Sequence, residues 1–509
     1  MPLSVAEFSE DQAEAFDRVA EVMLSAGIDM TKMVAKRRRG NRRAVVAVIG
    51  KAGSGKTMLL ARLAETLSEA GVEPVGGDYE GRRARRARTL AILAPTNKAA
   101  SVLRSHDVPA TTIHRILYTP VYDPEYEKIA EWLAGRRKKP KVDGVSEEAL
   151  DRAEAFYGKQ PSIPGALAVA GVKGSDFIKG WQRRDDPLDI GFVDEASMLD
   201  AEQFKDLQEI FSTLVMFGDP AQLAPVNQSG EMVFDTLPEP RKLSLSRIHR
   251  QDVDNPVLEL AHALGDENLT FEAFERMVED VAGNDGRVVL ASRVDATLMA
   301  RSPVLVWRNA TRVRLIHAFR TAHDAPPDRL LPGEPLICDG IELPFRHRMK
   351  RLDLEARGLI KGAQTIFLGP GNRTGFARMH VIGATEPQVS AASIIKIEMP
   401  EQVEPNILSA AQMGATFLHG AAVTIHKAQG SQWSDVQVFA PDLYAAYRSG
   451  RMEAGVPLWK RLAYVAITRA EERLHWVKRY MLGRPAAPLA THDLEKRAAP
   501  LALSAEEET

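Results

Sequence analysis

The sequence predicts an α/β protein whose parallel sheets are covered by helices on both faces. Short apolar segments of buried-strand character alternate with segments of helical apolar spacing as far as about residue 250, which is typical of such sheets. A second series of the same kind follows. Since 509 residues are too many for one hydrophobic core, we expect about two to four domains.

Composition places the chain among ordinary globular proteins, with 45% hydrophobic and 26% charged residues. The single cysteine, Cys338, excludes an internal disulfide and a cysteine-cluster zinc site, and it fits a reducing compartment. No apolar run approaches the roughly 18 residues of a membrane span, and the acidic start is no secretory signal. We therefore expect a cytosolic protein with no membrane partner.

Charge alone predicts no partner, because the formal net charge is −2. Basic clusters occur at residues 36–43, 82–88 and 136–139. Such clusters are more often solvated surface than ligand sites, so they permit phosphate contacts without demonstrating them.

The first functional signal is the string GKAGSGKT at residues 50–57, which matches the phosphate-binding P-loop G-x-x-x-x-G-K-[ST]. An apolar strand candidate, residues 44–49, leads into it, and good helix formers follow at residues 58–64. That context distinguishes it from a glycine-rich turn that carries a lysine by chance. The predicted nucleotide-binding residues are Gly50, Lys51, Ala52, Gly53, Ser54, Gly55, Lys56 and Thr57.

The residue types of this loop suit a nucleoside triphosphate with Mg²⁺. Glycines let the loop curl so that its N–H groups face phosphate oxygens, and the following helix adds the positive end of its dipole. Lys56 can reach the β- and γ-phosphates, and the Thr57 hydroxyl can ligate Mg²⁺.

An acidic pair is the second signal. Asp194 and Glu195 follow the apolar strand candidate at residues 190–193. An acidic residue there can hold the Mg²⁺–water shell, and its neighbour can orient or deprotonate the attacking water. By itself the pair would be an acidic strand end, common on any surface, but after a P-loop the functional interpretation is favoured.

The functional interpretation of three further residues depends on the motifs around them. Gln222, just after the strand candidate at residues 213–217, could sense the γ-phosphate by hydrogen bonding. Arg250 and Arg469 could supply the cations that phosphoryl transfer needs at the γ-phosphate. Alone, the glutamine would belong to an ordinary turn and each arginine would be solvated.

Three longer segments complete the organisation. Residues 5–25 predict an amphipathic helix, with Ser9 as N-cap and Gln12 in the capping-box position. Residues 119–188 are charged and mostly helical in pattern, which predicts an insertion. Residues 328–412 hold short alternating segments rich in proline and glycine, which predict a small β-rich insertion.

The motif set resembles the superfamily 1 helicases of the RecD/Dda-like group, superfamily 1B. Matching segments run in the expected order from Phe8 to about Val477. The strings at residues 423–432 and 464–469 are highly specific, so their chance occurrence together with a P-loop is negligible. The matching positions are Gln12 and residues 50–57, 94–100, 112–115, 193–198, 217–226, 245–251, 423–433 and 464–470.

The resemblance implies two RecA-like domains with Mg²⁺ and ATP in the cleft between them. Gln12 would lie at the adenine side, and Thr57 and Asp194 would hold Mg²⁺. The arginines would reach the γ-phosphate when the domains close. The implied catalytic residues are Lys56, Glu195, Gln222, Arg250 and Arg469.

Single-stranded DNA would cross both domains, by the same resemblance. Thr96, Asn97 and His114 would grip it on the first domain, and Thr424 and His426 on the second. Hydroxyl, amide and imidazole groups suit sequence-independent contacts. Without the motifs, each of the two histidines would as readily be a core residue.

The resemblance also divides the chain. It looks like the compact phage Dda type, which acts without an obligate nuclease partner. The implied units are RecA-like domain 1A (residues 1–118 and 189–250), a helical and charged insertion 1B (119–188), RecA-like domain 2A (251–327 and 413–484), a β-rich, SH3-like insertion 2B (328–412) and a disordered tail (485–509).

The implied function is an ATP-dependent DNA helicase that moves 5′→3′ on single-stranded DNA as a monomer, in the cytoplasm of a bacterium or a phage-infected host. Its expected partners are single-stranded DNA, duplex junctions and a single-strand-binding or replication protein. DNA repair, replication and recombination are the pathways open to it. Two alternatives stay open: an RNA helicase of the Upf1-like group, and a non-unwinding, ATP-gated DNA-binding module.

Overall fold

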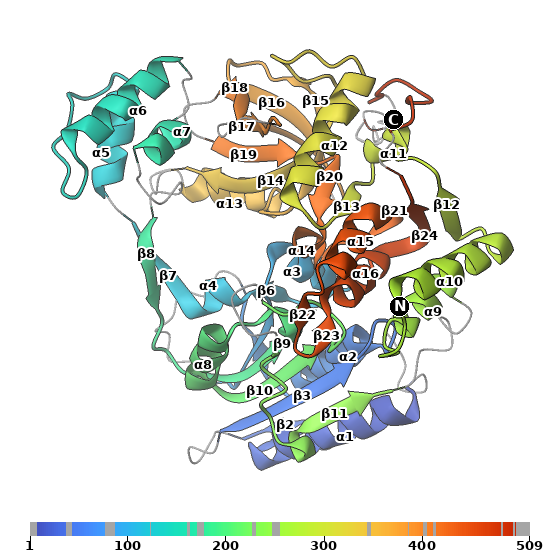
Figure 1. The fold of residues 1–509 in the computed structure, drawn as a ribbon. Coiled ribbons are helices and arrows are strands. Elements are labelled where there is room, and N and C mark those ends of the chain that lie inside the picture. Colours follow the sequence, from blue (N-terminus) through green and yellow to red (C-terminus); the bar gives the residue numbers. More distant parts are fainter. Residues whose placement is uncertain are drawn as a thin grey trace, which may run out of the picture.

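Three large sheets organise the fold, and two of them are parallel throughout (Figure 1). The predicted α/β architecture with two parallel sheets is therefore confirmed. The structure is a computed structural model. It describes residues 8–36, 43–76, 87–122, 124–159, 163–170, 178–225, 231–246, 255–343, 348–384, 386–400, 405–410, 414–479, 482–491 and 494.

The first parallel sheet has the strand order β11-β3-β10-β9-β5-β4, with β6 beside β5. Alternate residues of a strand point to opposite faces, so Val45 and Ala47 enter one core and Val48 enters the other. Both faces are buried, as the continuous apolar runs predict. The strands are β3 (Ala44–Gly50), β4 (Glu73–Pro74), β5 (Thr89–Ala94), β6 (Ala110–Thr112), β9 (Leu188–Val193), β10 (Phe211–Gly218) and β11 (Lys242–Leu245).

Helices cover both faces of this sheet and complete what we call the first domain. The predicted first helix begins at Glu10, and its Gln12 Oε1 accepts a hydrogen bond of 2.9 Å from the Ser9 N–H, as in a capping box. One face carries α1 (Glu10–Ser25), α2 (Lys56–Glu69) and α3 (Asn97–Ser105), and the other carries α4 (Ile113–Leu117) and α8 (Ala201–Ile210).

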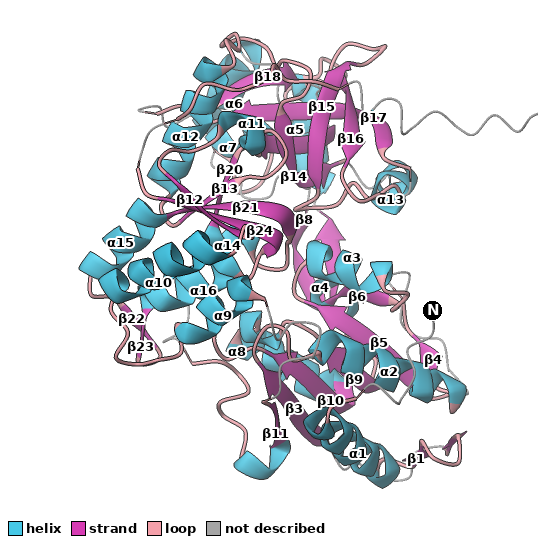
Figure 2. Cartoon of the chain, turned by 90° about the vertical axis from the view of Figure 1, so that its right-hand side faces the viewer, coloured by secondary structure: helices cyan, strands magenta, loops and turns pink. Residues whose placement is uncertain are grey.

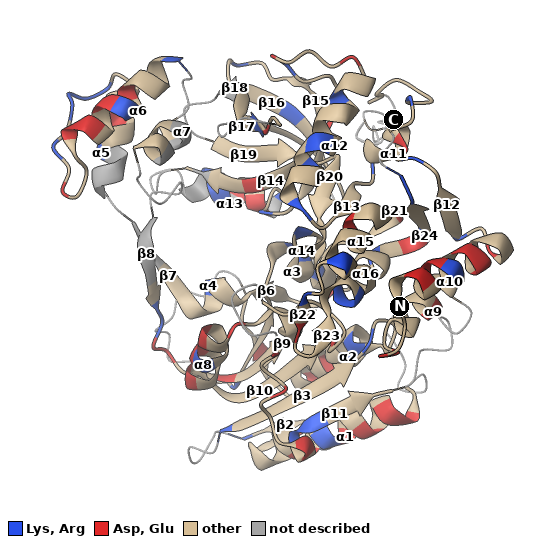
Figure 3. Cartoon of the chain, in the orientation of Figure 1, with Lys and Arg blue, Asp and Glu red and all other residues tan. Residues whose placement is uncertain are grey.

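An antiparallel stalk of two strands carries the first insertion away from this domain (Figure 1). The helices beyond the stalk bury a small core of their own, which includes Ile129, Leu150 and Leu167. The basic cluster at residues 136–139 is exposed in the loop that joins two of these helices (Figure 3). The elements are β7 (Tyr118–Tyr122), α5 (Pro124–Leu133), α6 (Glu147–Lys159), α7 (Ile163–Val169) and β8 (Ile178–Arg183).

The second parallel sheet has the order β12-β24-β21-β13-β20 and forms the second domain with its helices (Figure 2). Leu305 faces one core while its neighbours Val304 and Val306 face the other. The strands are β12 (Val288–Ala291), β13 (Val304–Val306), β20 (Ala422–Thr424), β21 (Trp433–Phe439) and β24 (Ala470–Val477). The helices are α9 (Pro256–Ala263), α10 (Phe271–Asn284), α11 (Ala296–Met299), α12 (Asn309–Ala322), α14 (Ile425–Ala428), α15 (Ala440–Arg448) and α16 (Leu458–Ile467).

The third sheet is mixed and makes up most of the second insertion. Its strand order is β16-β15-β14-β19-β17-β18, and β16 also pairs with β17, so five strands close on themselves. Its last strand in chain order, β19, spans Gly414–His419 and so lies beyond residue 412, where we expected the insertion to end. The elements are β14 (Pro335–Glu342), α13 (Arg348–Ala356), β15 (Gln364–Pro370), β16 (Phe376–Val381), β17 (Gln388–Ile397), β18 (Asn406–Ala410) and β19 (Gly414–His419).

The second insertion leaves and rejoins the second domain at adjacent points. The N–H of Gly420, just after the last strand, donates a hydrogen bond of 2.8 Å to the carbonyl of Pro335, the first residue of β14. The two chain connections therefore run side by side.

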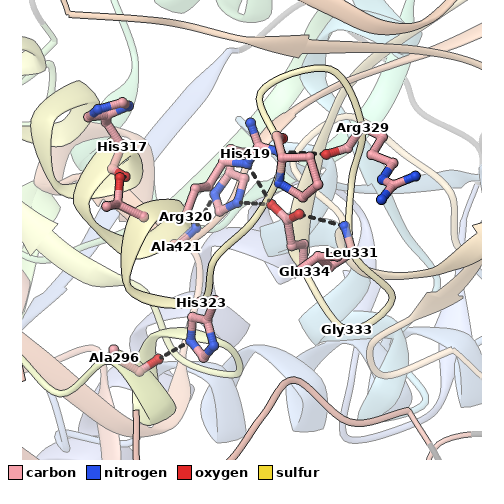
Figure 4. Close-up of polar contacts among 12 residues, drawn as sticks. Ala296, His317, Arg320, His323, Arg329, Leu331, Gly333, Glu334, His419 and Ala421 are labelled. Carbon is pink, nitrogen blue, oxygen red and sulfur yellow. Dashed lines mark hydrogen bonds and ion pairs between the residues drawn. The ribbon is translucent and has the colours of Figure 1, made fainter. Parts of the chain in front are cut away.

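A buried ion pair lies beside this junction (Figure 4). The Glu334 carboxylate is fully buried and accepts hydrogen bonds of 3.0 Å from Arg320 Nε and from His419 Nε2. The N–H of Ala421 donates to Nδ1 of His419 at 3.2 Å, which places the proton of a neutral imidazole on Nε2. Burial opposes the ionisation of Glu334, but the bond from His419 and the charge of Arg320 outweigh it, and its pKa is lowered.

Several predicted features lie outside the described residues. They include Arg250, most of the two other basic clusters (residues 37–42 of the first and 82–86 of the second) and the predicted tail from residue 495 onward. Among the helices that are described, none has the length and apolar character that crossing a bilayer requires.

Candidate functional site

The P-loop lies where β3 ends and α2 begins. Gly53 (φ 80°) and Gly55 (φ 75°) have left-handed backbone conformations, which favour glycine and let the loop turn sharply. Gly50 has no room for a side chain, since a Cβ atom would lie 2.4 Å from Ser54 Oγ. Lys56 Nζ donates a hydrogen bond of 2.6 Å to the Gly50 carbonyl. The ammonium group therefore lies over the loop that we expect to hold phosphate.

The acidic pair lies at the end of β9, on the same edge of the sheet, because the carboxyl ends of parallel strands meet there. Burial, and secondly the neighbouring Glu195 carboxylate, raise the pKa of Asp194 to about 7. Glu195 itself has a left-handed backbone with φ 51°. A non-glycine residue in this conformation is strained, and such strain is concentrated at functional sites.

Gln222 joins the acidic pair. Its Nε2 donates a hydrogen bond of 3.0 Å to Glu195 Oε2, and its Oε1 accepts one of 3.4 Å from Ser197 Oγ. The side chain is only 5% exposed, the bond from Ser197 is buried, and the bond to Glu195 is partly buried. The amide of Gln222 is thereby held against the carboxylate that we expect to activate water.

Gln12 reaches the P-loop from α1. Its Nε2 donates a hydrogen bond of 3.1 Å to the Ser54 carbonyl, and the side chain is 1% exposed. The same side chain therefore caps its own helix and supports the loop backbone. Its role at the adenine side stays a prediction.

The donor groups of this edge fit a magnesium ion. Mg²⁺ in nucleotide sites takes one or two protein oxygens and completes its shell with phosphates and water. The Thr57 hydroxyl and the Asp194 carboxylate would be those oxygens. Within the described part of the chain, no group of three or more His, Cys, Asp or Glu could by itself hold a metal ion.

The second domain contacts this edge through α16. Tyr464 Oη accepts a hydrogen bond of 2.7 Å from the Ala52 N–H and donates one of 2.6 Å to Asp219 Oδ2. Arg461 Nη1 donates to the Gln222 carbonyl at 2.5 Å. The second domain thus binds both the P-loop and the turn that carries Gln222.

Arg469 lies at the end of the same helix, but its described bonds are all within the second domain. Its guanidinium donates to the carbonyls of Val465 (3.1 Å) and Ser431 (3.2 Å) and to Thr468 Oγ1 (3.1 Å). Reaching a γ-phosphate would require these bonds to be exchanged.

The predicted DNA contacts of the first domain lie on short helices at strand ends. Thr96 caps α3, since its Oγ1 accepts the Ala99 N–H at 3.1 Å, and Asn97 is the first residue of that helix. Burial lowers the pKa of His114, in α4. Its neighbour Arg115 forms an ion pair with Glu355 of α13, which joins the first domain to the second insertion.

The predicted DNA contacts of the second domain lie at the end of β20. Thr424 is its last residue, and His426 is in the following helix α14, where burial lowers its pKa. Gly430 follows with φ 72°, and a Cβ atom there would lie 3.1 Å from Thr96 Oγ1. Gln429 Nε2 donates to the Leu223 carbonyl at 3.3 Å. This segment therefore contacts both α3, where DNA contacts are predicted, and the turn that carries Gln222.

Sequence patterns do not reveal three side chains that join the domains: Arg461, Tyr464 and His262. For Tyr464 a signal was available, because it begins a highly specific string. A buried tyrosine also needs a hydrogen-bond partner for its hydroxyl. Arg461 lies one turn earlier on the same face of α16. Nothing in the sequence around His262 distinguishes it from an ordinary helical histidine.

Comparison with known families finds two matched regions. The AAA domain family matches residues 32–282, and the UvrD-like helicase C-terminal domain matches residues 419–477. The first region holds the P-loop, the acidic pair and Gln222, and the second holds Thr424 and Arg469. No curated protein matches the chain.

Solved structures of Pif1 helicases are similar to the chain over nearly its whole length. Bacteroides Pif1 bound to single-stranded DNA has 14% identity and a TM-score of 0.47, over 96% of each chain. Candida albicans Pif1 has 16% identity and a TM-score of 0.46, over 96% of this chain and 98% of that one.

The fold and the site define a P-loop NTPase in which a second parallel-sheet domain closes over the nucleotide edge of the first. An AAA domain is followed by a UvrD-like helicase C-terminal domain, and the motifs within these two matched regions identify the chain as a helicase. The chain belongs to the superfamily 1B helicases, the group that contains RecD, Dda and Pif1.

Proposed function

We propose that this chain is an ATP-dependent DNA helicase that couples ATP hydrolysis to 5′→3′ movement on single-stranded DNA and to duplex unwinding. The observation that carries the proposal is a continuous set of contacts between the predicted nucleotide site and the predicted DNA contacts. The segment at Gln429 and Gly430 contacts the Gln222 turn on one side and Thr96 on the other. A rearrangement at the nucleotide would therefore be transmitted to α3.

The nucleotide-site roles follow from the chemistry of phosphoryl transfer. Lys56 would neutralise the β- and γ-phosphates, and Glu195, oriented by Gln222, would activate the attacking water. Mg²⁺ would neutralise further phosphate charge when held by Thr57 and Asp194. Arg250 and Arg469 would complete the site when the domains close. The remaining P-loop residues and Gln12 would bind the rest of the nucleotide.

The DNA track would run over both domains. Thr96, Asn97 and His114 would contact the strand on the first domain, and Thr424 and His426 on the second. The units would be domains 1A and 2A with the insertions 1B and 2B. The closed ring of five strands supports an SH3-like 2B insertion.

Unwinding assays with the Lys56→Ala variant test the proposal. The parent chain should hydrolyse ATP faster with single-stranded DNA and should unwind duplexes with a 5′ tail but not those with a 3′ tail. Lys56→Ala should abolish both activities and keep the parental melting temperature. Lys32→Ala, an exposed lysine in the turn after β1 (Ile28–Asp29), is the matched control and should behave as the parent.

The outcomes separate the parts of the proposal. Unchanged turnover in Lys56→Ala would contradict the assignment of the site. Unwinding of only the 3′-tailed duplex would reverse the polarity. Stronger stimulation by RNA than by DNA oligonucleotides would favour the Upf1-like alternative, and ATP hydrolysis without unwinding would favour the ATP-gated module.

A further inference from the structure

Both backbone groups of Ala52, in the P-loop, are bound by side chains of the second domain. The N–H donates a hydrogen bond of 2.7 Å to Tyr464 Oη, from α16. The carbonyl accepts one of 3.2 Å from His262 Nε2, from α9. A carbonyl can only accept, so Nε2 of His262 carries a proton. We call this pair of contacts the Ala52 clasp.

The tyrosine of the clasp is fixed at its other end as well. Its hydroxyl donates to Asp219 Oδ2 at 2.6 Å, and Asp219 Oδ1 accepts the Ala221 N–H at 2.9 Å. Burial, and secondly the Asp219 carboxylate, raise the pKa of Tyr464, so its hydroxyl keeps its proton and remains a donor. The Ala52 N–H, Tyr464 and Asp219 therefore form a chain of hydrogen bonds across the domain boundary, and its Tyr464–Asp219 link is buried.

The helix that carries Tyr464 is attached to the first domain at a second point. Arg461 lies three residues earlier, on the same face of α16. Its Nη1 donates to the carbonyls of Gln222 (2.5 Å) and Pro220 (3.4 Å). Because α16 is bound at both points, it cannot withdraw from the Gln222 turn without also pulling on Ala52.

We propose that Tyr464 and His262 are positioning residues, and that the Ala52 clasp makes nucleotide exchange at the P-loop depend on separation of the two domains. The proposal rests on the proposed function only in that the P-loop binds a nucleotide. The backbone N–H groups of a P-loop are the groups that face phosphate. The helices α16 and α9 lie against the P-loop at Ala52, so moving them away from the loop breaks both bonds to Ala52.

The release rate of a fluorescent ADP measures the clasp directly. The nucleotide is bound to the full chain with Mg²⁺ and displaced by excess ATP, and its dissociation is followed by stopped-flow fluorescence. Tyr464→Phe removes one hydroxyl and keeps the ring, so release should become about two- to tenfold faster, which corresponds to one hydrogen bond of ordinary strength. Tyr444→Phe, the same change at a tyrosine 42% exposed on α15, should release ADP at the parental rate.

Histidine variants separate the hydrogen bond from simple packing. His262→Leu fills a similar volume without a donor and should accelerate release, whereas the amide of His262→Gln can still donate to Ala52 and should restore the parental rate. With saturating DNA, Tyr464→Phe and His262→Leu should change the ATP KM more than kcat. A residue that served only packing would lower the melting temperature equally in both His262 variants and leave the release rate unchanged.

The results that overturn the proposal are specific. Parental release from well-folded Tyr464→Phe and His262→Leu shows that the clasp does not limit exchange, and equal acceleration in His262→Leu and His262→Gln shows that the donor is irrelevant. If Tyr464→Phe fails to fold, the His262 pair decides. A parent chain that binds no fluorescent ADP contradicts the proposed function and the clasp together, whereas normal nucleotide binding with unaltered variants contradicts the clasp alone.

Discussion

The side-chain amide of Gln222 donates a hydrogen bond to the carboxylate of Glu195, whose own backbone has a left-handed conformation. Two segments that are distant in the sequence thus fix the position of one carboxylate at the edge of the first sheet. This position is what we expect of a general base that activates water.

Glu195→Gln should separate binding from hydrolysis. The amide keeps the shape of the side chain but cannot take a proton, so we expect kcat of the DNA-stimulated ATPase to fall by about 10²–10⁴. Binding of fluorescent ADP should stay within about twofold of the parent, because this group acts on water rather than on the nucleotide. Turnover close to parental would show that another group is the base.

Glu334→Ala should be strongly destabilising. It leaves the buried Arg320 guanidinium without its carboxylate, which costs about 3–5 kcal/mol of unfolding free energy, measured by urea denaturation. The matched control is Glu386→Ala, whose carboxylate is 77% exposed and 3.8 Å from Arg357, and this change should alter stability little. Equal losses in both variants would show that burial of the Glu334 pair is energetically unimportant.

Gly430→Ala should weaken DNA binding. Alanine at φ 72° costs about 1–2 kcal/mol, and its Cβ would also press on Thr96, which caps α3 and is a proposed DNA contact. Gly450→Ala is the control, because φ there is 62° but no atom lies within 4 Å of the added Cβ. Both variants should lose stability in urea because of the backbone strain, while fluorescence anisotropy with single-stranded DNA should show weaker binding only for Gly430→Ala.

Acid should destabilise the protein through its half-buried histidines. Burial lowers the pKa of His114 and of His426 below 6.5, so the unfolded chain binds protons at a higher pH than the folded chain does. The unfolding free energy should therefore fall as the pH drops from about 6.5 toward the folded-state values. His114→Gln and His426→Gln should each flatten this slope in urea denaturation between pH 5 and 8, and an unaltered slope in both would contradict the prediction.

The P-loop and the strands around it could be predicted because their signals are local. The strand β3, the loop and the helix α2 follow one another directly, and each depends on the character of adjacent residues. The parallel strands are buried on both faces, so their apolar runs are continuous and easily recognised. The position of the acidic pair beside the P-loop then follows, because the carboxyl ends of parallel strands lie at the same edge of the sheet.

The contacts between the domains, the buried ion pair and the strands of the third sheet could not be predicted, because they depend on residues that are distant in the sequence. Tyr464 and Ala52 are 412 positions apart, and no local pattern joins them. A glutamate before a strand gives no sign that it will be buried, and the partners of Glu334 come from a helix and from the end of β19. In the third sheet, irregular pairing near Cys338 and Phe367 interrupts the alternation that would have identified the strands.

The hydrogen bond between Gly420 and Pro335 has a consequence for protein engineering. The whole third sheet is inserted between two points that are one hydrogen bond apart. A short turn could join these points without altering the register of β13 and β20, in the same way that a hairpin turn joins adjacent strands. The sheet is therefore attached as a cassette: we expect that it can be excised, or exchanged with that of a relative, if the contacts of Arg312 with Glu398 and of Trp433 with Gln364 are replaced.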